Sequence, residues 1–139
     1  IHPMRKKPLK EVETYSGKML QPEDYSDVEI DTEDYASVLL NFREGQKGAL
    51  TVSQCAAGRK NRVYLEVHGT EKSCAWDSEK CNELWIGSRE EMNSVLMRDA
   101  SLMNESSHKF VDYPGGHNEG FPDTFKQLYK DFYEDVKLG

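Results

Sequence analysis

A glycine-rich segment ahead of a predicted helix is the stretch of this sequence best suited to hold a polar ligand. It runs from Tyr113 to Asp123 and includes His117. Three glycines let its backbone take conformations that other residues avoid. The nearby positive end of the helix dipole disfavours protonation, and a neutral imidazole can donate or accept a hydrogen bond. We therefore expect His117 to contact a polar substrate. The alternative is a histidine that only braces the turn.

A second candidate lies in a bend between two predicted strands. Arg59, Lys60 and Asn61 follow the small residues Ala56, Ala57 and Gly58. Two cations and an amide presented on such a bend are suited to contact a phosphate or a carboxylate. The alternative is a solvated connection whose charges keep the chain soluble.

Other chemical signatures do not occur. The sequence contains neither the GxGxxG pattern nor the P-loop pattern, and it has no GxSxG nucleophile motif. Cys55, Cys74 and Cys81 are spaced unlike any paired metal-binding motif, which favours free thiols and no metal site. We expect no catalytic and no cofactor-binding residue within this chain.

Composition narrows the class of protein. The chain has 139 residues, a net charge of -7 and a pI near 5.1. Its length suits one domain, and its charge argues against nucleic acid as a partner. No unbroken run of hydrophobic residues exceeds three, so neither a membrane span nor a signal peptide is expected. These features predict a cytoplasmic protein.

Most of the sequence alternates with the period of a β-strand. Ala36, Val38, Leu40 and Phe42 fall on one face of a predicted strand, and residues 43–46 form a turn into a return strand over 47–55. A second hairpin is predicted from two further strands. The remaining expected strands are shorter, and one lies in an acidic loop over 23–34. The other predicted strands cover 11–16, 28–30, 61–68, 73–77, 83–86, 94–98 and 109–113.

Only the last stretch has the period of a helix. Phe125, Leu128, Tyr129, Phe132 and Val136 recur at helical spacing after Pro122 and Asp123, which suit a first helical turn. The predicted fold class is α+β, with an open, mainly antiparallel β-sheet and one long C-terminal α-helix packed on it. Because one helix covers only part of a sheet that is apolar on both faces, we expect another domain or subunit to cover the rest.

Five segments of the sequence carry a resemblance to a known family. The segments are Tyr35-Ala36-Ser37-Val38-Leu39-Leu40-Asn41-Phe42, Gly48-Ala49-Leu50-Thr51-Val52-Ser53, Gly58-Arg59-Lys60-Asn61, Gly69-Thr70-Glu71-Lys72-Ser73 with Trp76-Asp77, and Gly115 to Phe125. In this order they resemble the C-terminal domain of the Gfo/Idh/MocA oxidoreductases. The resemblance covers about residues 33–136, and the opening residues 1–8 are similar to the start of that domain.

This resemblance implies a parent enzyme with an N-terminal Rossmann domain that binds NAD or NADP and transfers a hydride at a hydroxyl-bearing carbon of a sugar, inositol or related polyol. The family's catalytic Lys, Asp and His motifs do not occur in this chain. Carried over by the resemblance are His117 as a substrate contact and, less directly, Arg59, Lys60 and Asn61. The family's open sheet also implies a homo-oligomer formed through the sheet face.

The sequence opens at Ile1, not at a methionine. We therefore expect residues 1–139 to be a single domain cut from a longer two-domain dehydrogenase, inactive without its Rossmann domain; a processed N-terminus is the alternative. A competing hypothesis is a stand-alone, non-catalytic module that binds a carbohydrate or a protein.

Overall fold

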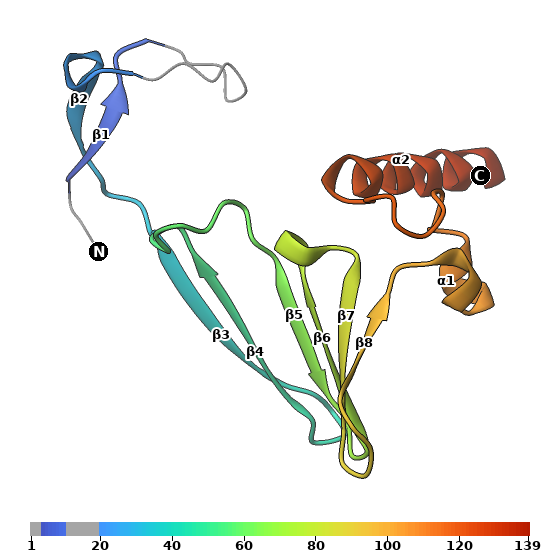
Figure 1. Cartoon of the computed structure of the whole chain (residues 1–139). Helices are drawn as coiled ribbons and strands as arrows, with labels where there is room; N and C mark the ends of the chain where they lie inside the picture. The colour runs from blue at the N-terminus through green and yellow to red at the C-terminus, as the bar shows by residue number, and fades with distance from the viewer. Residues whose placement is uncertain (1–3, 11–19) are drawn as a thin grey trace. The chain divides into compact units, whose positions relative to one another are not determined.

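The computed structural model describes residues 4–10 and 20–139. They fall into two units, Ile1–Gly58 and Arg59–Gly139, and each is described by itself. The first unit holds two antiparallel strand pairs, and the second holds a four-stranded sheet and two helices (Figure 1). The edge strand predicted over 11–16 lies outside the described residues, and the assignment of the chain to a single domain stays a prediction.

The first unit consists of two separate strand pairs. Strand β1 (Met4–Pro8) pairs with β2 (Tyr25–Glu29), and β3 (Tyr35–Asn41) pairs with β4 (Lys47–Ser53). The strand predicted at 28–30 is therefore longer and begins earlier, inside the acidic segment. The predicted turn at 43–46 is confirmed, since Gly45 takes a φ of 90° and its N–H donates to the Phe42 carbonyl at 3.1 Å.

The β3–β4 hairpin has one apolar and one mixed face, because its register places like residues opposite one another. Val38 pairs with Leu50, and Ala36 pairs with Val52. On the other face the hydroxyls of Ser37 and Thr51 lie 3.4 Å apart. Side chains on the apolar face are about half exposed, at 45% for Val38 and 54% for Leu50.

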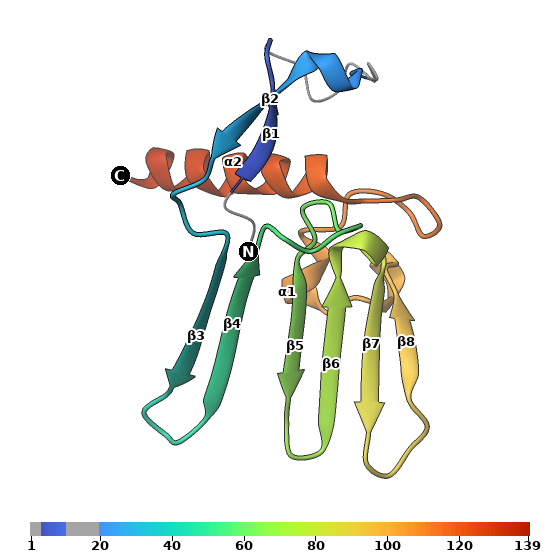
Figure 2. The same ribbon diagram turned by 90° about the vertical axis from the view of Figure 1, so that its left-hand side faces the viewer.

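The second unit is built on an antiparallel sheet whose strands lie in sequence order (Figure 2). Its strands are β5 (Tyr64–His68), β6 (Lys72–Asp77), β7 (Glu83–Ser88) and β8 (Ser94–Met97). These confirm the second predicted hairpin and the two strands expected after it. The register gathers Leu65, Val67, Cys74, Trp76, Leu84, Ile86 and Leu96 on one face.

The strand predicted over 109–113 is wrong. A short helix, α1 (Glu105–His108), precedes this segment and is capped by the Asn104 side chain, which accepts from the Ser107 N–H at 2.9 Å. The chain then continues in turns. The N–H groups of Phe110 and Val111 donate to carbonyls three residues earlier, so they form turns and do not pair with a neighbouring strand.

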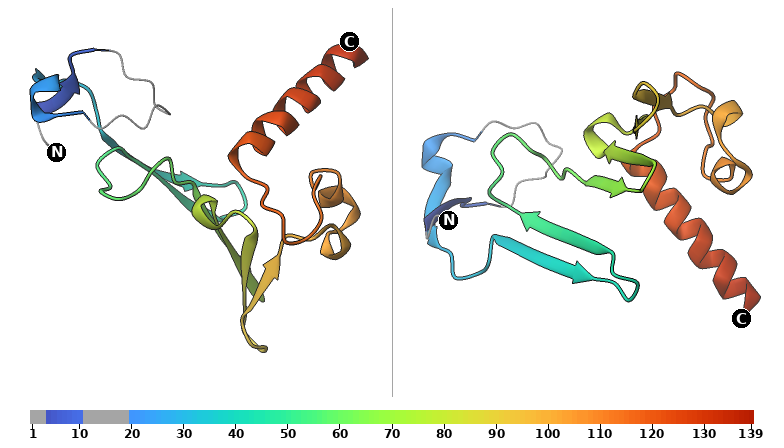
Figure 3. Two further views of the ribbon diagram at one scale, coloured as in Figure 1. Left: turned by 45° about the horizontal axis from the view of Figure 1, so that its top comes forward. Right: turned by 90° about the horizontal axis from the view of Figure 1, so that it is seen from below.

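Helix α2 (Phe121–Leu138) is a single uninterrupted helix (Figure 3). Asp123 fixes its first turn by accepting from the Gly120 N–H at 2.9 Å. The helix is amphipathic as predicted, but its packing on the sheet is not observed. Its apolar side chains stay open to solvent, with 62% of Leu128 and 57% of Phe132 exposed.

The α+β fold class with open antiparallel sheets and a long C-terminal helix is confirmed. Across residues 6–10 and 20–139, no hydrophobic side chain is buried. A chain of this length ordinarily hides much of its apolar surface, so both the sheets and α2 present surface that suits a partner. None of the helices in those residues is long and apolar enough to cross a bilayer.

Candidate functional site

His117 ends a tight turn that the glycines make possible. Its N–H donates to the Pro114 carbonyl at 3.3 Å, and Gly116 takes a φ of 82° at the third position of the turn. Only glycine adopts that conformation without strain at a tight turn of this kind. The His117 side chain is exposed, so the turn presents the imidazole to solvent.

Arg98, the residue that follows β8, holds this turn by hydrogen bonds to backbone carbonyls. Its Nη1 donates to the Tyr113 carbonyl at 2.8 Å, and its Nη2 donates to the Pro114 carbonyl at 3.1 Å and also to the His117 carbonyl. Its Nε donates to the Asn82 Oδ1 at 2.9 Å. One guanidinium therefore binds three carbonyls, two in the turn and one in the residue before it, which its planar fork of donors allows.

Glu119 supplies the counter-charge for Arg98. Glu119 Oε2 lies 2.7 Å from the Arg98 Nη1, and the two side chains are only 6% and 12% exposed. Glu119 Oε1 accepts from the Asp112 N–H at 2.7 Å. Asn82 completes the network, because its Oδ1 also accepts from the Glu119 N–H at 3.2 Å and its Nδ2 donates to the Asn118 Oδ1 at 2.8 Å.

Asp99 closes the other side of the turn. Its carboxylate accepts from the Ser101 N–H at 2.9 Å and from the Ser101 hydroxyl at 2.8 Å. These hydrogen bonds lower the pKa of Asp99. The same carboxylate lies against Gly115, where an added Cβ would overlap it. A side chain at position 115 would therefore force the Asp99 carboxylate to move, and Gly116 is favoured by its backbone conformation.

Asp112 ties the segment to α2. Lys126 Nζ lies 2.7 Å from the Asp112 Oδ2, and the Gln127 Nε2 donates to the same oxygen at 2.8 Å. The hydrogen bond from Lys126 lowers the pKa of the Asp112 carboxyl and raises the pKa of Lys126. The first turns of α2 and the segment carrying His117 thus form one connected structure.

Part of the second predicted segment, Arg59 to Asn61, forms contacts within the chain. Arg59 forms an ion pair with Glu79, in the 3₁₀ helix Ser78–Lys80 that follows β6. Asn61 takes a φ of 51°, a left-handed conformation that asparagine tolerates. Lys60 is exposed, and no ion pair forms on it within the described ranges. These geometries agree with a structural bend, while Lys60 is left available to a ligand.

Both predicted segments are fastened to the connection between β6 and β7. Arg59 binds Glu79, and Asn118 binds Asn82, three residues further along. They therefore share one end of the four-stranded sheet. No hydrogen bond or ion pair in the described part of the chain joins His117 directly to Arg59, Lys60 or Asn61.

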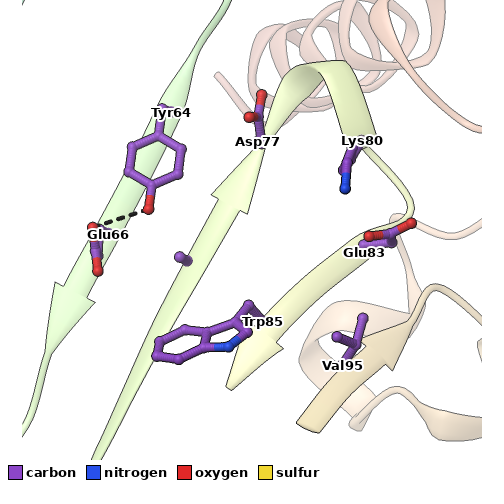
Figure 4. Close-up of a pocket in the computed structure, with 8 residues that line it drawn as sticks. Tyr64, Glu66, Asp77, Lys80, Glu83, Trp85 and Val95 are labelled. Carbon is purple, nitrogen blue, oxygen red and sulfur yellow. Dashed lines mark hydrogen bonds between the residues drawn. The ribbon is translucent and has the colours of Figure 1, made fainter. Parts of the chain in front are cut away.

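A shallow concavity of about 430 Å³ lies on the more polar face of the same sheet, and it contains none of the predicted site residues. In Figure 4, Trp85 and Tyr64 lie across its floor, and the Tyr64 hydroxyl donates to the Glu66 carboxylate at 2.9 Å. That hydrogen bond raises the pKa of Tyr64. Beside it, Arg62 donates to both Asp77 oxygens and lowers the pKa of Asp77. The other lining residues are Ala75, Lys80, Glu83 and Val95.

Sequence reasoning missed Asn82, Arg98 and Glu119. Nothing in their spacing marks them, because they lie up to 37 positions apart and meet only in the folded chain. The sequence contained one indication of this network. Glu119 lies within the glycine-rich segment, where a carboxylate needs a cation nearby if it is buried.

Across the described ranges, no group of three or more His, Cys, Asp or Glu side chains is placed to hold a metal ion.

The lowered pKa of Asp99 predicts acid sensitivity of the turn. A carboxyl with a folded-state pKa below its ordinary value of 3.8 stabilises the fold above that value. The contribution is lost as the pH falls through the folded-state pKa. Asp99→Asn keeps a capping oxygen but does not titrate. We expect Tm to fall less between pH 7 and pH 3 for Asp99→Asn than for the wild type, measured by circular dichroism. Equal losses would contradict this assignment.

Comparison with known proteins places the chain. Residues 5–75 match the GFO/IDH/MocA C-terminal domain, a span that does not include His117. A comparison with curated protein sequences finds no match. Among solved structures, an oxidoreductase from Sinorhizobium meliloti is 30% identical over 73% of this chain and 30% of its own, with a TM-score of 0.67.

Two further structures agree with this assignment. An inositol dehydrogenase homolog from Azotobacter vinelandii, solved with NADH and myo-inositol, is 26% identical over 70% of this chain and 26% of its own, with a TM-score of 0.65. A levoglucosan dehydrogenase solved with NADH and L-sorbose, 20% identical over 80% of this chain and 30% of its own, shares the fold with a TM-score of 0.67. The chain spans about 30% of the length of the Sinorhizobium structure. The family resemblance is confirmed, and the chain belongs to the C-terminal domain family of the GFO/IDH/MocA oxidoreductases.

Proposed function

We propose that this chain is the substrate-binding and oligomerising part of an NAD(P)-dependent oxidoreductase that acts on a sugar, inositol or related polyol. In the parent enzyme a Rossmann domain, outside this chain, carries the dinucleotide and the proton-transfer residues. His117 contacts a substrate hydroxyl. Arg59, Lys60 and Asn61 lie at the margin of the same pocket, with Lys60 the residue most available for a polar contact.

The carrying observation is the construction around His117. The turn is held by Arg98 through three carbonyls, yet the imidazole itself is exposed and makes no hydrogen bond or ion pair within the described residues. A histidine that served only to brace its turn would be expected to use its ring for that purpose. An available ring on a fixed backbone supports a ligand contact.

The residues of this chain do not fit a dinucleotide. A pyrophosphate favours a glycine-rich turn that opens onto free N–H groups at a helix N-terminus. At the start of α2 the Gly120 N–H is already bound by the Asp123 carboxylate, whose negative charge would repel a phosphate. NAD or NADP therefore belongs to the missing domain in this proposal, and no step of the reaction is assigned to the cofactor here.

The exposed apolar surface supports two partners. The apolar side chains of α2 and of the β3–β4 hairpin are exposed, the central strands β6 and β7 are largely half-buried, and no apolar side chain in the described ranges is buried. In this proposal the Rossmann domain covers part of that surface, and a second copy of the chain covers a sheet face. A homo-oligomer formed in this way uses only sheet residues that the chain already contains.

Removing the His117 imidazole is expected to weaken catalysis by the full-length enzyme. His117→Ala should lower kcat/KM on a polyol about 10- to 100-fold, or about 1.4–2.7 kcal/mol of transition-state stabilisation. The matched control is His68→Ala, at the end of β5 far from the turn, with a side chain that is 71% exposed. An unchanged kcat/KM for His117→Ala would reduce His117 to a turn residue.

The chain by itself is expected not to bind NADH or NADPH. Isothermal titration calorimetry of residues 1–139 with each dinucleotide should show no binding in the micromolar range, because the sequence contains neither the GxGxxG nor the P-loop pattern that holds a pyrophosphate. A submicromolar Kd would contradict the assignment of the cofactor to another domain.

The chain is expected to dimerise through one face of the four-stranded sheet. Val67→Lys and Val95→Lys place a charge on opposite faces, and one of them should convert the dimer to a monomer in analytical ultracentrifugation. Met92→Lys is the control, since Met92 lies in the β7–β8 turn and is 92% exposed. A dimer that survives both strand substitutions would rule out the sheet as the interface.

A further inference from the structure

Arg98 and Glu119 form the most enclosed charged pair in the described part of the chain, at 12% and 6% side-chain exposure. Neither charge reaches solvent freely, so the pair does not serve solubility. Three hydrogen bonds of Arg98 go to carbonyls of the segment that carries His117, those of Tyr113, Pro114 and His117. The pairing of the sheet strands does not explain why so many buried polar contacts hold one short surface turn.

We propose that Arg98 is a positioning residue for the substrate contact made by His117, a role that rests on the proposed function of His117. The Arg98 Nη2 binds the carbonyls of Pro114 and His117, the first and last residues of the turn. The orientation of the His117 peptide is thereby fixed from its carbonyl side. Its N–H is fixed by the Pro114 carbonyl at 3.3 Å.

Arginine suits this role and lysine does not. The Arg98 side chain uses Nε, Nη1 and Nη2 toward Asn82, Tyr113 and the two ends of the turn at the same time. A planar guanidinium holds these directions rigidly, whereas an ammonium offers three donors from a single point. Replacement by lysine therefore keeps the charge opposite Glu119 but loses the simultaneous grip on the turn.

Glu119 and Asn82 in turn hold Arg98. The Arg98 Nη1 donates to the Tyr113 carbonyl, and the Glu119 Oε2 lies 2.7 Å from the same nitrogen and compensates its charge, although this oxygen accepts no hydrogen bond from the described residues. Asn82 accepts from both the Arg98 Nε and the Glu119 N–H. The position of the guanidinium is thus determined by groups on both sides of it.

Preorganisation is the functional consequence. A side chain on a fixed turn loses little conformational freedom when a substrate binds, and displacement of a contact by about 1 Å can lower a rate up to about 100-fold. Arg98 therefore acts on the substrate only through His117. This dependence separates a positioning role from a general effect on stability.

A double-mutant cycle in the full-length enzyme tests the proposal. Arg98→Lys should lower kcat/KM for a polyol about tenfold and leave KM for NAD(P) unchanged. In the His117→Ala background the same substitution should cost less than about twofold, because the contact it positions is gone. Arg89→Lys is the matched control, since Arg89 also binds a backbone carbonyl, that of Thr70, but at the far end of the sheet.

Each outcome has a distinct meaning. Equal costs of Arg98→Lys in both backgrounds would overturn the positioning role while leaving His117 as a substrate contact. No effect of His117→Ala alone would overturn the proposed function and the positioning role together. If Arg98→Lys does not fold, Glu119→Gln is carried through the same cycle, because it removes the charge that holds Arg98 and keeps the shape of the side chain.

Discussion

Hydrogen bonding between antiparallel strands, and not burial of apolar side chains, holds together the part of this chain that the structure describes. Neighbouring strands pair their backbone groups, but the described residues contain no buried hydrophobic side chain. Two- to four-stranded sheets whose apolar faces are half-buried or exposed gain less from the hydrophobic effect than a closed core does. The exposed apolar surface of the strands and of α2 therefore determines where a partner domain or subunit can bind this chain.

Local periodicity carried most of the fold prediction. The alternation at Val38 and Leu40 and the helical spacing of Phe125 and Leu128 report directly on which side of an element is apolar, so those elements were predictable. Residues 109–113 were not, because their alternation competes with local hydrogen bonds after α1. The partner surface of α2 was not predictable in detail either: an apolar stripe shows that a helix can be covered, but not by which surface.

The candidate site separates into a predictable and an unpredictable part. Glycines and a histidine before a helix mark the turn at His117 in the sequence. The guanidinium that organises this turn belongs to Arg98, the residue directly after β8, and the amide that orients the guanidinium belongs to the connection after β6. Contacts between residues so distant along the chain arise from the register of the sheet, which one sequence does not specify residue by residue.

Asp112 has a double attachment with mechanical implications. Its N–H is bound to Glu119, while its carboxylate is bound to Lys126 and Gln127. An 18-residue helix is a rod of about 27 Å, so a small tilt of α2 is magnified at its free end and resisted at its anchored one. A partner that binds the far end of that rod therefore acts on Glu119, the counter-charge of Arg98, by two routes: directly along the chain at Gly120, and through the contacts of Asp112.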